Sequence, residues 1–321
     1  MSDSILILKS PSITILTEVL MIFFATLALV FNGVAFYITV FRIGFKTAAV
    51  GLMAIIATLD IIISFNVIIV DVMNFATSHQ ILNNRSFCTY TGMIYMLVPM
   101  SSIDGIGLLS LLRLLSVSYN KEFKAIYWYS VMGAMFIYNV VINIFGVTND
   151  IYEIMPSEAY CYSGYAPGTY SELFALMLLL KFLVMFALIL ISYTGITVTV
   201  YKTFSQLNTS DISSEQVLCD KPYTQHQRRL IYRLFILIAL YMICFGPALV
   251  FTTYTAVTNK WRTAIMDSIS GIAFSLALLV NSIFVLVYQR EARDILISIV
   301  PIWLYTSKSN FELVGLKNIQ I

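Results

Sequence analysis

A few charged side chains lie inside long apolar stretches of the sequence, and they are the residues best placed to do chemistry. Asp60, Asp104 and Lys181 are the three examples. Charges in such stretches are rare and usually face a protein interior or a water-filled cavity. Asp60 is either a structural carboxylate bonded to Ser or Asn, or an ion- or proton-sensing switch. Lys181 could pair with an acid, reach water or contact a ligand, whereas Gly105 and Gly107 beside Asp104 favour a structural role in helix packing.

Residues for enzymatic chemistry are scarce. His79 and His226 are the two histidines, and both lie in polar stretches. The four cysteines show no C-x-x-C spacing, and no H-E-x-x-H sequence suggests a metal site. The apolar stretches hold no closely spaced carboxylate pair of the kind that hydrolysis within a membrane needs. The sequence therefore predicts neither an enzyme nor a metal site, and its net charge of +2 gives no indication of a nucleic-acid partner.

Membrane-spanning helices are the elements that must position these residues. The chain is 59% hydrophobic and 11% charged, whereas about a quarter of the residues of a soluble domain are charged. A helix needs about 20 apolar residues to cross a bilayer, and open strands are excluded there. The predicted fold is an all-α membrane protein, a seven-transmembrane helix bundle followed by a short amphipathic eighth helix. The seven predicted helices lie near 16–41, 49–73, 89–113, 126–147, 172–201, 230–255 and 264–288.

The distribution of Lys and Arg predicts the orientation of these helices, because cytoplasmic loops are enriched in both. If residues 1–15 are extracellular, fourteen of the 19 Lys and Arg lie on the inner side, four lie outside and Lys181 lies within a span. We therefore expect a multi-pass plasma-membrane protein. Residues 289–321 would be cytoplasmic and begin with a helix on the inner leaflet. Glu18, Asp71 and Asp267 would lie near the outer helix ends, within reach of water.

Three residues on the predicted outer side are candidates for covalent modification. Cys88 lies at the outer end of the third span, and Cys161 lies in the second outer loop. An oxidising compartment favours a disulfide between them, although two unpaired thiols are the alternative. Asn84-Arg85-Ser86 matches the N-glycosylation sequon, but a triplet this close to the membrane can equally stay unmodified.

The sixth predicted span contains a proline, Pro247, which should kink the helix because it frees a backbone carbonyl. The kink is either static or a pivot about which the inner segment swings. That inner segment carries three basic residues: Arg228, Arg229 and Arg233. Asn281 is a polar residue deep in the seventh span, where it can pair with Asp60 if the two helices are neighbours.

The order and spacing of several residues resemble those of rhodopsin-like (class A) G-protein-coupled receptors, from about residue 16 to 304. In chain order they are Asn32-Gly33, Leu59-Asp60, Cys88, Arg113, Cys161, Cys244-Phe245-Gly246-Pro247 and Asn281-Ser282. The resemblance implies that Arg113 engages a heterotrimeric G protein when the sixth helix moves outward, with the three basic residues of that helix nearby. It also implies that Phe245 senses the ligand and acts as a switch with Pro247 and Asn281. A sodium or proton site would be formed by Asp60, Ser102 and Asn281.

The chain also departs from the pattern of that family. Leu112 replaces the acid before Arg113, and Leu114 replaces the aromatic residue after it. Without its usual acidic partner, Arg113 is expected to permit appreciable ligand-free signalling. The last span contains no Lys, and Ser275 occupies the place of the retinal-binding Lys of opsins, so no retinal and no other cofactor is expected apart from a bound sodium ion. These departures indicate a divergent member, of a type typical of chemosensory receptors.

Two classes of function remain after these exclusions. The first is a receptor for an extracellular ligand that activates a G protein. Its candidate pocket residues are Tyr95, Met96, Pro99, Lys181, Thr252, Tyr254 and Asp267. The alternative is a seven-span transporter or channel, but the sequence has no obvious repeat between its halves and few charges at depth.

Overall fold

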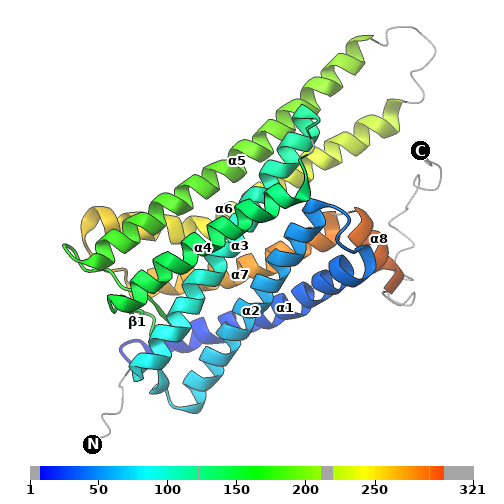
Figure 1. Ribbon diagram of the computed structural model, residues 1–321. Coiled ribbons are helices and arrows are strands. Elements are labelled where there is room, and N and C mark those ends of the chain that lie inside the picture. Colours follow the sequence, from blue (N-terminus) through cyan, green and yellow to red (C-terminus); the bar gives the residue numbers. More distant parts are fainter. Residues whose placement is uncertain (1–7, 122, 211–219, 289, 300–321) are drawn as a thin grey trace, which may run out of the picture.

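The long apolar runs form seven helices in the described part of this computed structural model, and Figure 1 shows how these helices pack into one bundle. Residues 8–121, 123–210, 220–288 and 290–299 are described. The seven helices are α1 (Pro11–Tyr37), α2 (Ala48–Ala76), α3 (Arg85–Tyr119), α4 (Ala125–Thr148), α5 (Tyr170–Ser210), α6 (Asp220–Thr258) and α7 (Ala264–Tyr288). The shorter elements are the π-helix η1 (Ile38–Ile43), the 3-10 helix η2 (Ile81–Asn83), strands β1 (Tyr152–Ile154) and β2 (Cys161–Ser163), and helix α8 (Arg290–Ile299).

All seven predicted helices are present, and each contains a stretch long and apolar enough to cross a membrane. The bounds of α7 agree with the prediction, whereas α3, α5 and α6 extend beyond the predicted ends. Apolar composition marks only the part of a helix that lies in lipid, and polar residues can continue the same helix beyond it. The short helix predicted after residue 289 is α8.

Helix ends coincide with residues that suit them. The Thr47 side chain accepts a hydrogen bond from the Val50 amide at 3.3 Å and caps α2. Asn84 caps α3 in the same way, by accepting from the Phe87 amide at 3.2 Å. At the other end of α3, Asn120 has a left-handed backbone that stops the helix.

Helix α3 is the most buried of the seven spans and packs against α2, α4 and α5. Two of its glycines permit close approach: a Cβ at Gly105 would lie 2.7 Å from the Ile56 side chain, and one at Gly107 would lie 2.3 Å from Met185. The expectation that these glycines serve helix packing is confirmed. Helix α1 packs on α2 and α7, and α6 packs between α5 and α7.

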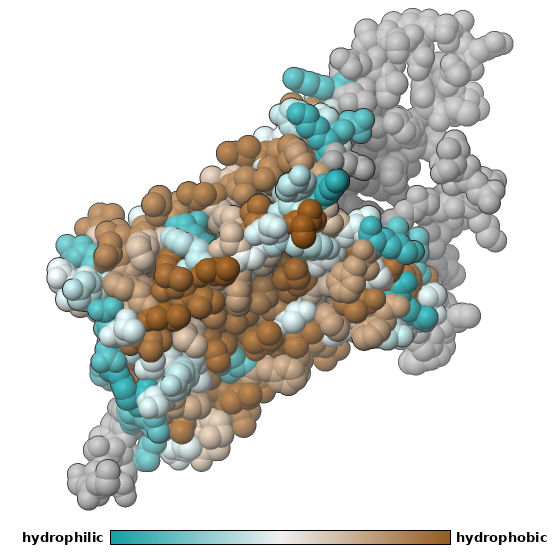
Figure 2. All heavy atoms as spheres, in the orientation of Figure 1, coloured by the Kyte–Doolittle hydropathy of each residue, from teal (hydrophilic) through white to brown (hydrophobic). Residues whose placement is uncertain are grey.

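The outward-facing surface of the helices between the two ends of the bundle is apolar. Figure 2 shows hydrophobic side chains covering the middle of the visible face, with hydrophilic side chains gathered toward the two ends. Exposed apolar residues occur on most helices, for example Phe23, Ile69, Ile137, Leu180 and Val250. So continuous an apolar surface is unfavourable in water and suits a hydrocarbon environment. The chain is a multi-pass membrane protein by these criteria.

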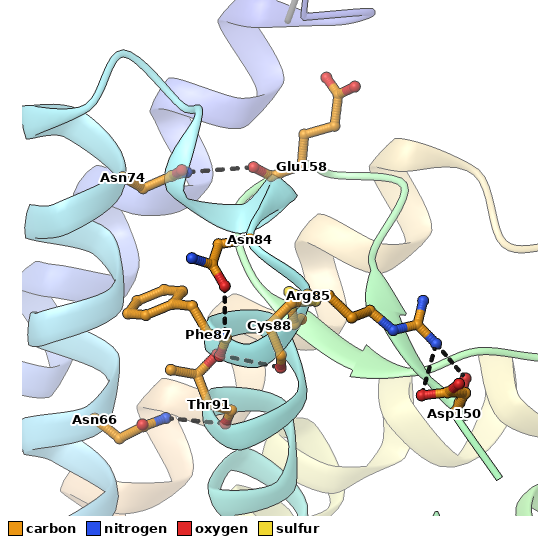
Figure 3. Close-up of a disulfide and its surroundings, with 10 residues drawn as sticks. Asn66, Asn74, Asn84, Arg85, Phe87, Cys88, Thr91, Asp150 and Glu158 are labelled. Atoms are coloured by element: carbon orange, nitrogen blue, oxygen red, sulfur yellow. Dashed lines mark hydrogen bonds and ion pairs between the residues drawn. A yellow bond between two sulfur atoms is a disulfide. The ribbon is translucent and has the colours of Figure 1, made fainter. Parts of the chain in front are cut away.

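The predicted disulfide is present and defines one end of the bundle, called here the disulfide end. Cys88 and Cys161 are bonded, with their Cα atoms 5.4 Å apart. Cys161 belongs to the antiparallel hairpin of β1 and β2, so the bond fixes this hairpin against the start of α3. Figure 3 shows further ties around it, including an ion pair between Arg85 and Asp150 at 3.0 Å. The opposite end carries α8 and is called the α8 end (Figure 1).

Candidate functional site

The candidate ligand site is a cavity at the disulfide end, bordered by α3, α5, α6, α7 and β2. It has two adjoining parts, with about 680 Å³ and 560 Å³ of space between atoms, some of it open to solvent. Both parts are lined by Tyr162, Phe182, Thr252 and Arg262, among others. Clefts that are lined mostly by apolar side chains with a few polar groups are typical of small-molecule sites.

Four of the predicted pocket residues line this cavity: Tyr95, Met96, Pro99 and Thr252. Tyr254 lines neither part and is 38% exposed on the outer face of α6. Two positions apart on a helix are about 200° apart around its axis, so Thr252 and Tyr254 cannot both face inward. The prediction for Tyr254 is therefore wrong.

Lys181 does not line the cavity either, which corrects its assignment as a pocket residue. Its Nζ atom lies 2.9 Å from Oδ2 of Asp104 and donates to Oδ1 of Asn139. The Asn139 amide in turn donates to Asp104 at 2.8 Å. The neighbouring Phe182 faces the cavity, and a rotation of about 100° per residue turns Lys181 toward α3 and α4. Of the roles open to Lys181, the structure shows pairing with an acid.

Asp267 is the third pocket prediction that the structure corrects. Its carboxylate is fully buried and accepts hydrogen bonds from the Ser157 amide and hydroxyl at 3.2 and 2.5 Å, and from the Tyr160 hydroxyl at 2.8 Å. Burial, followed by the Asp267 charge, holds the pKa of Tyr160 well above its usual value, so this hydroxyl stays protonated and donates. Asp267 therefore fixes the hairpin to α7.

The expectation that Glu18 and Asp71 lie within reach of water is also wrong, because both side chains are fully buried. Glu18 accepts a hydrogen bond from Asn74 at 2.5 Å, and the same amide reaches the backbone carbonyl of Glu158 in the hairpin at 3.4 Å (Figure 3). The hairpin thus covers the ends of α1 and α2. Within the described residues, the Asp71 carboxylate has no hydrogen-bond partner.

Midway through the bundle, Asp60, Ser102 and Asn281 meet as predicted. Asp60 Oδ1 accepts from the Ser102 hydroxyl at 2.7 Å, and Oδ2 accepts from Asn281 Nδ2 at 2.9 Å. All three side chains are buried. The Asp60 and Ser102 oxygens are ligand types that a small cation accepts. Asn281, however, directs its nitrogen toward Asp60, and its oxygen accepts from the Tyr241 hydroxyl at 3.1 Å.

Tyr241, which was not among the residues expected at the site, connects this polar network to the cavity. Phe245 lines the cavity, and its ring stacks on that of Tyr241 with the centroids 5.9 Å apart. Pro247 lies two residues further along α6. The sequence could have indicated Tyr241, because it lies four positions before Phe245 and residues four apart lie on the same face of a helix. A continuous path of contacts therefore runs from the cavity through Phe245, Tyr241 and Asn281 to Asp60.

At the α8 end, Arg113 is half-buried between helices. Its guanidinium lies 4.8 Å from the centre of the Phe284 ring on α7 and beside the Tyr193 hydroxyl on α5. Arg228, Arg229 and Arg233 belong to α6, but their side chains lie outside the described residues. The predicted group of four arginines is therefore placed only in part.

The remaining predicted site residue, Asn84, is exposed at the start of α3, where its Oδ1 atom serves as the helix cap. In the described part of the chain, no group of three or more His, Cys, Asp and Glu side chains is arranged to hold a metal ion. No family model matches the sequence, and no curated protein matches it. The geometry of the bundle is therefore the basis for assigning a function.

Proposed function

We propose that the protein is a divergent rhodopsin-like G-protein-coupled receptor of the plasma membrane. It binds an extracellular ligand in the cavity at the disulfide end. Binding moves the α8 end of α6 outward about Pro247, and the opened bundle activates a heterotrimeric G protein. A chemosensory ligand is the class that best suits so divergent a sequence.

The observation that carries this proposal is the path of contacts from the cavity to the middle of the bundle. Phe245 lies at the cavity wall, and its ring also meets that of Phe182 on α5 at 5.8 Å. A ligand that displaces either ring alters the stacking on Tyr241, and through Tyr241 the hydrogen bond to Asn281. Because packed cores are bistable and not continuously deformable, such a displacement can select a second packing of α6.

The proposed orientation rests on the excess of Lys and Arg at one end of the bundle. It places the disulfide end outside the cell, where the bond is stable. It also places Asn84 outside, so the sequon is available for glycosylation. Arg113 then lies at the cytoplasmic end, where a G protein can reach it.

The alternative function, a transporter or channel, finds less support. Charges at membrane depth would have to line a conducting path. In the described residues, Asp104 and Lys181 instead pair with each other, and Asp60 is bonded to Ser102 and Asn281. Solute or ion flux in proteoliposomes without any G protein would favour this alternative.

Co-expression with a panel of G proteins tests the proposal, with nucleotide exchange or second-messenger output as the readout. The wild-type chain should raise output, and Arg113→Ala should abolish the increase. Arg42→Ala is the matched control, because Arg42 lies in η1, where it contacts the Tyr37 ring at 6.0 Å, and it has no proposed coupling role. Equal output from wild type and Arg113→Ala at equal surface expression would contradict the proposal.

A further inference from the structure

The connection between α6 and α7 forms one wall of the cavity mouth and is bonded to the loop that follows β2. The indole nitrogen of Trp261 donates to the backbone carbonyl of Tyr165 at 2.6 Å. The Tyr165 hydroxyl donates in return to the side-chain oxygen of Asn259 at 2.7 Å. These two bonds tie the connection to the segment that follows β2, and the next residue, Arg262, lines the cavity.

Arg262 differs from every other described residue that lines the cavity, because it alone is charged at neutral pH. Its guanidinium lies 5.8 Å from the centre of the Tyr162 ring, and its side chain is 12% exposed. Burial raises the pKa of the Tyr162 hydroxyl, and the Arg262 charge opposes part of that rise. Because the guanidinium lies over the face of the Tyr162 ring, this contact orients Arg262 and leaves the N–H donors of Arg262 available.

The described residues leave most of the N–H donors of Arg262 without an acceptor. A guanidinium has five N–H donors in a planar fork that suits a carboxylate. Within the described part of the chain, its one acidic partner is Asp267 at 3.9 Å, beyond hydrogen-bonding distance. Asp267 already accepts from Ser157 and Tyr160. Arg262 therefore keeps donors available for a second acceptor in the cavity.

The rest of the cavity is suited to an apolar body. Met100, Leu178, Phe182 and Ala248 contribute apolar surface, and Phe245 closes the inner part. The α6 helix ends at Thr258, before Arg262 in the connection, yet the Arg262 side chain reaches far enough to line the inner part of the cavity together with Phe245. A molecule that meets both residues carries a polar group toward Arg262 and an apolar body toward Phe245.

We propose that this cavity binds an apolar carboxylic acid. Arg262 holds the carboxylate at the mouth of the cavity through paired hydrogen bonds, and the apolar body extends toward Phe245. The assignment rests on the proposed role of the cavity as the ligand site of a receptor. It adds the chemical class of the ligand, which is an anion and not an amine or a neutral lipid.

Direct binding to the purified full-length protein in detergent micelles tests this assignment without any G protein. The probes are phenylbutyrate and decanoate, each compared with its methyl ester, its primary alcohol and its primary amine. Both acids should bind, and the matched esters, alcohols and amines should bind about tenfold to a hundredfold more weakly. Arg262→Gln should weaken acid binding by a similar factor, and Arg262→Lys should restore part of it.

Lys260→Gln is the matched control, because it removes the same charge from an exposed neighbour that does not line the cavity. Its acid binding should equal that of the wild type. Thermal unfolding without ligand identifies any variant that fails to fold.

Acid binding that is unchanged in Arg262→Gln, tighter binding of the esters or amines, or no binding of either acid would overturn the assigned ligand class. Failure of the receptor proposal is distinct. If acids bind through Arg262 but never raise G-protein output, the ligand class stands and the receptor function fails. If Arg113-dependent output is seen while the acids do not bind, the receptor function stands and the ligand class fails.

Discussion

Replacing Lys181 with methionine separates a structural role from a ligand-binding role for this residue. Asp104 has no exposed surface and Lys181 is 11% exposed, so the ion pair between them is almost fully removed from solvent. Methionine is one atom shorter than lysine, keeps an unbranched apolar side chain and removes the charge. Asp104 would then retain only the hydrogen bond from Asn139, and its charge would be buried without a cation.

The expected cost follows from the geometry. Coulomb's law at an effective dielectric constant of about 20 gives roughly 6 kcal/mol for unit charges separated by the observed 2.9 Å. Much of this attraction is offset by desolvation, and breaking a buried pair by removing one partner costs about 3–5 kcal/mol. At about 2 °C per kcal/mol for a chain of this size, the apparent midpoint of thermal unfolding should fall by about 6–10 °C.

Thermal unfolding of the purified protein measures this effect, with a double-mutant cycle to isolate the pair. The double variant Lys181→Met with Asp104→Asn should regain most of the lost stability, because no unpaired charge remains. Lys202→Met is the control, since Lys202 is exposed on the same helix. A Lys181→Met variant of unchanged stability that no longer responds to ligand would refute the ion-pair account and return Lys181 to the ligand site.

Three further predictions concern coupling and the hairpin. Tyr241→Phe removes the hydroxyl that donates to Asn281; ligand affinity of the purified protein should be unchanged while maximal G-protein output falls, and equal output would exclude this path. Leu112→Asp supplies an acid beside Arg113 and should lower ligand-free output, whereas the uncharged Leu112→Asn should not. Reduction of the disulfide frees the hairpin and should cost about 2–4 kcal/mol, or about 4–8 °C in the unfolding midpoint; an unchanged midpoint after complete reduction would show that the hydrogen bonds of Asp267 suffice to hold the hairpin.

Several parts of the fold could be predicted because their causes are local. The length of an apolar run determines whether a helix can cross a bilayer, so all seven helices were identified from composition. A disulfide depends on two cysteines being brought to the same compartment, which the order of the helices ensured for Cys88 and Cys161. The meeting of Asp60, Ser102 and Asn281 followed from the resemblance to a known family, and the structure places the three within hydrogen-bonding distance.

The incorrect predictions for pocket residues and for buried carboxylates have two causes. The sequence does not show which side of each helix faces the cavity, and it does not show where the hairpin lies. Lys181 and Phe182 are neighbours in sequence, yet one pairs with Asp104 and the other lines the cavity. An apolar run shows no hydrophobic face that would reveal this difference, because lipid is as apolar as the core. Arg262 also escaped notice, since an arginine in a polar connection has no feature in the sequence that places it in a cavity.

Composition alone therefore predicted seven helices that can cross a membrane. Each polar residue placed in lipid adds its own transfer free energy, so the total for a run of residues can be read from the sequence. Tertiary structure decided which side chains share a cavity and which are buried at the helix ends. Asp267 accepts from Ser157 in the hairpin between α4 and α5, and Asn74 bonds both Glu18 and the Glu158 carbonyl of that hairpin, so both carboxylates are buried where the hairpin meets the helix ends. That arrangement depends on contacts between residues more than 100 positions apart, such as Ser157 with Asp267, which no local pattern records.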